Sequence, residues 1–130
     1  MRESQSSHFW VGNFPQERAA NYFTEIWDEN DEDREHTPLS AFARDQGIMW
    51  YDHDFIEYGF EEGAGSVEKL VKGYSYSEQW GFELARRAAA AGLSGVNLFV
   101  FINEEEIEKP RSVKGEDWWL QYLGTIEYRI

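Results

Sequence analysis

Apolar residues recur at three- and four-residue spacing in four stretches of the chain. This period places them on one face of a helix, so the pattern predicts helices over residues 15–28, 38–46, 67–72 and 78–91. The first begins at Pro15, a residue that suits the start of a helix because it lacks a backbone N–H. The other three stretches are bounded by residues typical of helix ends, namely the caps Thr37, Ser66 and Ser77 and the glycines Gly47, Gly73 and Gly92.

Shorter apolar runs predict strands over residues 9–13, 48–51, 55–60, 96–102 and 118–130. Residues 96–102 are apolar at nearly every position, which is typical of a strand near the centre of a sheet and covered on both faces. Residues 118–130 alternate, which predicts one packed and one solvated face, and places Trp118 and Trp119 on opposite sides. The packed face is expected to carry Leu120, Tyr122, Ile126, Tyr128 and Ile130.

The order of these elements has no regular β-α-β-α rhythm. We therefore predict an α+β fold, with a mainly antiparallel sheet packed against a few helices. The chain contains no internal repeat and no linker rich in Pro, Gly or Ser, so residues 1–130 are read as a single domain.

The amino-acid composition argues against several classes of function. The 25 acidic residues against 12 basic ones give a formal charge of −13, which opposes nonspecific binding to nucleic acid or to an anionic membrane. With 42% hydrophobic residues the chain can form a core, and without cysteine it has neither disulfides nor thiol nucleophiles. No apolar segment is long enough for a membrane span or a signal peptide, so a cytoplasmic location is expected.

Motifs for catalysis are mostly missing: no phosphate-binding loop, nucleophile elbow or zinc helix occurs. Residues 28–35 are rich in acids, but neither frame of an EF-hand loop fits them. The pattern Asp52-His53-Asp54 is compatible with a functional site, either a metal site or a carboxylate-supported base, and equally with a surface turn or strand end. We favour the turn, and expect no catalytic residue, metal or cofactor.

Acidic residues are interleaved with aromatic ones, most clearly between Trp50 and Glu62. Negative charge steers a basic partner, and exposed aromatic rings supply anchors for an interface. We therefore expect a protein partner with a basic surface. The predicted binding residues are Asp28, Glu29, Asp31, Glu32, Asp33, Trp50, Asp52, Asp54 and Glu57.

Two motifs add a resemblance. His8-Phe9-Trp10-Val11-Gly12-Asn13-Phe14 leads into a predicted helix, and residues 42–48 run on to Trp50-Tyr51-Asp52-His53-Asp54-Phe55. Together they resemble the Immunity protein 22 family of bacterial polymorphic-toxin systems. The resemblance implies a small cytoplasmic α+β protein, encoded beside a toxin gene, that neutralises the toxin without catalysis.

Many such toxins are nucleases, and a nuclease needs a basic groove to hold phosphate. The leading hypothesis is therefore an immunity protein that binds a cognate toxin, such as a nuclease, through an acidic and aromatic surface. Two alternatives remain: a metal-dependent hydrolase that uses Asp52, His53 and Asp54, and an acidic DNA mimic that acts as a decoy.

Overall fold

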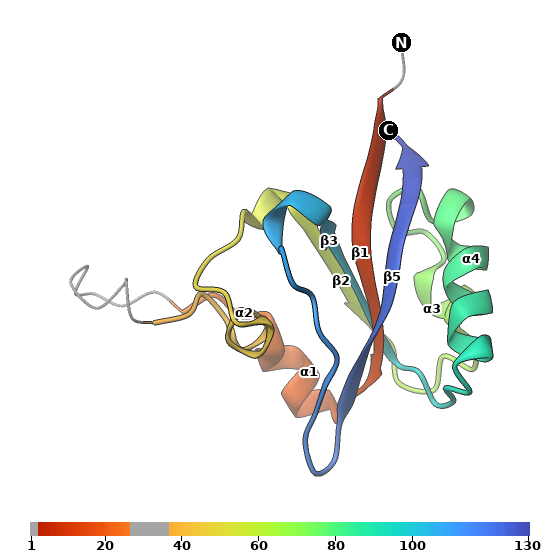
Figure 1. The fold of residues 1–130 in the computed structure, drawn as a ribbon. Coiled ribbons are helices and arrows are strands. Elements are labelled where there is room, and N and C mark those ends of the chain that lie inside the picture. The colour runs from red at the N-terminus through yellow and green to blue at the C-terminus, as the bar shows by residue number, and fades with distance from the viewer. Residues whose placement is uncertain (1–2, 27–36) are drawn as a thin grey trace.

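A five-stranded antiparallel sheet lies between two layers of helices (Figure 1). The computed structural model describes residues 3–26 and 37–130. The strand order is β2-β3-β1-β5-β4. The strands are β1 (Ser4–Asn13), β2 (Ile56–Phe60), β3 (Leu98–Asn103), β4 (Val113–Lys114) and β5 (Trp119–Arg129), and the helices are α1 (Gln16–Tyr22), α2 (Ala41–Gln46), α3 (Val67–Val71) and α4 (Ser77–Ala90), with short 3-10 turns η2 (His53–Phe55) and η3 (Glu104–Glu106). The predicted α+β class is confirmed.

Each face of the sheet has its own hydrophobic core. Trp10 on β1 packs edge-on against Phe42 of α2, with ring centroids 5.3 Å apart. On the opposite face Phe9 packs against Trp80 of α4 at 5.0 Å. Because both faces are covered, consecutive residues of the inner strands are all buried, as they are from Leu98 to Ile102. The prediction of a strand buried on both sides is therefore confirmed for β3.

The last strand departs from the predicted alternation. His8 on β1 lies opposite Thr125, and Trp10 lies opposite Tyr122, so two residues of β5 face one residue of β1. Gly124, with φ +96°, provides the left-handed backbone that this bulge requires. Beyond the bulge the side chains change faces.

As a result four of the five residues expected on one face divide between the two cores, and the fifth, Ile130, is 43% exposed. Leu120 and Tyr122 pack on the α1–α2 side, whereas Ile126 and Tyr128 pack on the α3–α4 side. The prediction of a single packed face was wrong, because helices cover both sides and the bulge shifts the period by one residue. Trp118 and Trp119, which precede the bulge, face opposite cores as predicted.

The helix ends also differ from prediction. The helix α1 ends at Tyr22, short of Asp28, which lies outside the described residues. The cap of α2 is Ser40, whose hydroxyl accepts from the Ala43 N–H at 3.1 Å, so that Thr37 is not the cap. Before α4, Tyr76 adopts a left-handed conformation (φ +59°), and Ser77 is the first helical residue.

Residues 48–51 form no strand. The Leu39 N–H donates to the Met49 carbonyl at 2.8 Å, and the buried Tyr51 hydroxyl lies 3.0 Å from the hydroxyl of Ser40. These bonds hold the segment against the start of α2, where it cannot reach the sheet. The predicted strand over residues 55–60 is confirmed as β2, one residue shorter.

Raising the pH above about 10 is expected to destabilise the fold. Burial raises the pKa values of the Tyr22, Tyr51 and Tyr128 hydroxyls above their ordinary 10.0, and for Tyr22 the Asp45 carboxylate raises the pKa further. The folded state then holds protons that the unfolded chain releases, so this stability is complete below pH 10 and is lost as the pH rises. Urea unfolding at about pH 8 and about pH 11 measures the loss.

Tyr22→Phe is the control for this alkaline effect, because it removes one of the protons involved. The variant should lose less stability between the two pH values than the unmodified chain loses. Equal loss in the two proteins would exclude Tyr22 as a contributor.

Candidate functional site

The predicted binding residues fall into two groups. Asp28, Glu29, Asp31, Glu32 and Asp33 lie outside the described residues. Trp50, Asp52, Asp54 and Glu57 lie within them, in the segment that joins α2 to β2 and in β2 itself. This second group can be placed on the structure.

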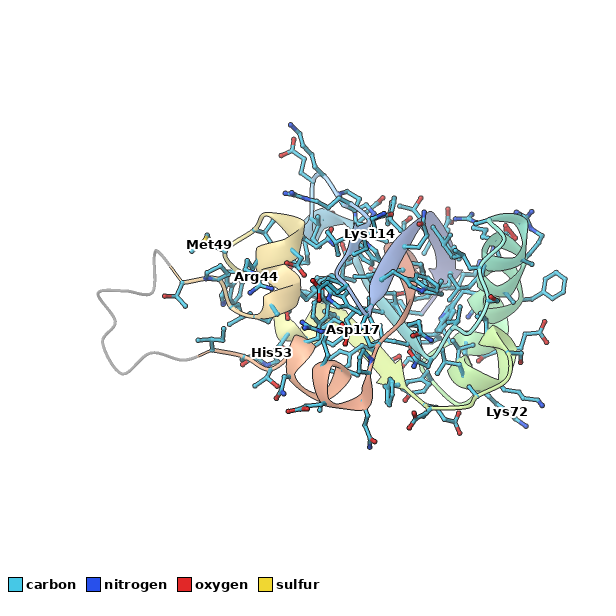
Figure 2. All side chains as sticks on the ribbon, turned by 90° about the horizontal axis from the view of Figure 1, so that it is seen from below. Arg44, Met49, His53, Lys72, Lys114 and Asp117 are labelled. Carbon is cyan, nitrogen blue, oxygen red and sulfur yellow. The ribbon has the colours of Figure 1, made fainter. Side chains whose placement is uncertain are left out.

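Trp50 is an exposed residue between two residues that are held in place by contacts with the rest of the protein. Its side chain is 55% exposed, between Met49, whose carbonyl bonds to Leu39, and the buried Tyr51. Figure 2 shows Met49 and His53 on the side of the molecule that carries α1 and α2, with Lys72 at the opposite end. Trp50 is therefore an exposed ring on the α1–α2 side of the sheet, and the residues on either side of it are held in place.

Asp52 organises the turn that leads into β2. Its carboxylate accepts from the Asp54 N–H at 2.9 Å and caps η2, while its own N–H donates to the Glu106 carboxylate at 2.6 Å. The turn leaves Asp54 and Phe55 projecting into solvent, with Phe55 48% exposed. Asp54 thus presents its charge to solvent, whereas Asp52 also supports the turn.

Glu57 points toward the other helical layer. Its carboxylate accepts from the Ser75 N–H at 3.0 Å and from the Ser75 hydroxyl at 2.8 Å. Ser75 belongs to the loop between α3 and α4. Glu57 therefore attaches that loop to β2, and its side chain lies on the face away from α1 and α2.

Exposed rings lie on both sides of β2. Tyr58, 46% exposed, stacks on Phe23 with centroids 4.1 Å apart, beside a hollow of about 350 Å³ that His53 also lines. Phe55 and Tyr76 line a second hollow of about 280 Å³ on the α4 side. Phe55 and Tyr58 are interleaved with the acids in sequence, but only the structure brings Tyr76 to this place.

His53 does not complete a metal centre in the described part of the chain. Its two ring nitrogens lie 3.5 Å from the Glu25 carboxylate and 3.4 Å from that of Asp54, and the side chain is 64% exposed. Residues 3–26 and 37–130 contain no group of three His, Asp or Glu side chains that could hold a metal ion. The turn interpretation of Asp52-His53-Asp54 is the one that the geometry favours.

The carboxylates beside β2 have no cationic partner from Lys or Arg among the described ion pairs. The sequence contains no Lys or Arg between Arg44 and Lys69. By contrast, hydrogen bonds from Arg86 and Arg87 lower the pKa of Glu83 to about 2. Within residues 3–26 and 37–130, Asp52, Asp54 and Glu57 therefore form no ion pair with Lys or Arg.

Exposed rings beside carboxylates that lack cationic partners are features of protein-binding surfaces. The chain belongs to the family described as Immunity protein 22, whose model matches residues 8–129. Membership of an immunity-protein family indicates a toxin-neutralising role. No curated protein and no solved structure gives a significant match. Among the helices described here, none has the length and apolar character needed to span a membrane.

Proposed function

We propose that this chain neutralises a cognate polymorphic toxin, a nuclease, by binding its basic surface in the cytoplasm of the producing cell. The surface assigned to this contact is the β2 surface, made of Trp50, Asp52, Asp54, Phe55 and Tyr58. The observation that carries the proposal is the exposure of three aromatic rings beside Asp52 and Asp54, whose carboxylates form no ion pair with Lys or Arg in the described part of the chain. The protein needs no chemistry of its own, because filling a basic groove excludes the substrate.

Charge and rings have separate parts in this contact. A nuclease must attract phosphate with Lys or Arg, and the same field attracts an acidic inhibitor and speeds its association. The rings of Trp50 and Tyr58 then provide apolar contact area that slows dissociation. We leave Glu57 out of the proposed contact, because its carboxylate accepts two hydrogen bonds from Ser75.

The first experiment is co-expression with the product of the adjoining gene. A one-to-one complex, weakened by salt and required for the survival of cells that make the partner, is expected. Failure to form any complex would contradict the proposed function. A stable partner encoded elsewhere would instead favour the DNA-mimic hypothesis.

Charge reversal locates the contact. Asp52→Lys combined with Asp54→Lys is expected to reduce the association rate at low salt by about tenfold or more, since it reverses the local field. The matched control is Glu78→Lys with Glu127→Lys, which changes the net charge equally at exposed positions on α4 and β5. Stopped-flow measurement at two salt concentrations gives both rates.

Equal slowing in the two variants would show that only net charge matters, and would remove the β2 surface from the proposal. Because Asp52 also caps η2, the single variant Asp54→Lys is measured as well. This single variant retains the cap. It should change the logarithm of the association rate by about half as much as the double variant does.

A further inference from the structure

Within the described residues, the outer edge of β2 carries a row of backbone groups without hydrogen-bond partners. The Glu61 N–H donates to the Asn97 carbonyl at 2.9 Å, in the same register that joins β2 to β3. Hydrogen-bonded pairs alternate in an antiparallel ladder, so Glu57 and Gly59 also bond to β3. Ile56, Tyr58 and Phe60 therefore direct their N–H and C=O groups away from β3. No hydrogen bond from residues 3–26 or 37–130 reaches these outward groups.

The second half of β5 shows how this fold closes a free edge. The Gln79 side chain donates to the Arg129 carbonyl at 2.8 Å and accepts from the Arg129 N–H at 2.9 Å. The Arg87 guanidinium donates to the carbonyls of Leu123 and Thr125 at 2.9 and 2.8 Å. Side chains of α4 thus satisfy outward groups of Leu123, Thr125 and Arg129 on β5, whereas the part of the chain that the structure describes offers β2 no such cover.

The surroundings of the β2 edge suit one kind of occupant. Tyr58 on one face and Phe55 with Tyr76 on the other leave rings exposed on both sides of the strand. Carboxylates lie at both ends of the strand, since Asp54 precedes it and Glu61 and Glu62 follow it. An added strand that carries Lys or Arg would place apolar stems on the rings and cations near the acids.

We propose that β2 receives an extended, basic segment of the bound toxin as a sixth strand of the sheet. This proposal rests on the proposed function and specifies how the partner is held: main-chain bonds to Ile56, Tyr58 and Phe60 supply affinity, and the surrounding acids select a basic sequence. A second copy of this chain is a poor occupant, because pairing two β2 edges would bring like charges together.

Residue-resolved amide exchange tests the proposal. In the free chain the amides of Glu57, Gly59 and Glu61 should be protected, while those of Ile56, Tyr58 and Phe60 exchange. In the purified complex with the adjoining gene's product, the second set should slow by at least about tenfold. If the complex forms and these amides still exchange freely, strand addition is excluded while the proposed function stands.

Two further outcomes decide between occupants. Protection of the Ile56, Tyr58 and Phe60 amides in the free chain, together with a dimer in sedimentation, would assign the edge to a second copy and overturn the proposal. Absence of any complex would remove the proposed function and this proposal together. Protection only in the complex supports strand addition.

A pair of substitutions at one position gives an independent readout. Tyr58→Pro removes an outward N–H without removing a bond to β3, and Tyr58→Ala removes the same ring but keeps that N–H. The proline variant should bind the toxin about tenfold more weakly than the alanine variant. Equal affinities would contradict strand addition. If the proline variant does not fold, the exchange measurement on the unmodified chain still decides.

Discussion

Replacing Trp80 with alanine is expected to lower the free energy of unfolding by about 3–5 kcal/mol. Trp80 is fully buried and packs against Phe9, Phe99 and Phe101 at centroid distances of 5.0, 5.8 and 5.0 Å. Its indole N–H also donates to the Ser75 carbonyl at 2.9 Å, in the loop that Glu57 attaches to β2. The variant therefore loses packing, leaves a cavity and releases that loop. Chemical denaturation followed by circular dichroism measures the change.

The matched control for Trp80 is Phe82→Ala on the same helix. Phe82 is 72% exposed, so its removal should change the free energy of unfolding by no more than about 0.5 kcal/mol. A similar loss in both variants would show that the helix itself, rather than the core beneath it, is sensitive to substitution.

Asn97→Ala is expected to cost about 3 kcal/mol, the second-largest effect. The buried Asn97 side chain accepts from the Phe14 N–H and donates to the Phe14 carbonyl, both at 2.9 Å. Alanine leaves two buried backbone groups of Phe14 without partners, which costs more than the loss of exposed hydrogen bonds. The same denaturation experiment measures it.

Asn103→Ala provides the comparison, at the other end of β3. Its side chain accepts from the Glu105 N–H at 2.9 Å in an exposed turn, where water can replace it. We expect a loss of no more than about 1 kcal/mol. A loss for Asn97→Ala as small as this would mean that water replaces the amide at Phe14, and would contradict the prediction.

The two motifs of the family resemblance occupy different environments in the molecule. In the first, Phe9, Trp10 and Val11 are fully buried at the centre of the sheet, so this motif specifies the fold. The second motif instead runs through Trp50, Asp52 and Asp54, which belong to the surface proposed for the toxin contact. Of the two motifs, only the second therefore carries information about the residues of the proposed contact.

The acidic and aromatic segment could be found from sequence because its composition is local. The separate orientation of Glu57 could not, because the bonds to Ser75 join residues 18 positions apart. Tyr76 was missed for a related reason. It lines the same hollow as Phe55, but no pattern in residues 67–77 predicts this proximity. The face switch in β5 depends on a bulge whose only sequence signal is Gly124.

The sequence by itself determined the α+β class, the buried character of residues 98–102, the family and the negative charge. Each depends on composition or on periodicity within one short segment, and can therefore be predicted without knowing which strands pair. Only the tertiary structure decided that helices cover both faces, that side chains of α4 bond to the edge of β5, and that no other described residue bonds to the outer edge of β2. Strand order and edge exposure arise from pairing between segments that are distant in sequence. The free energy of pairing depends on both segments, so it cannot be inferred from either one alone.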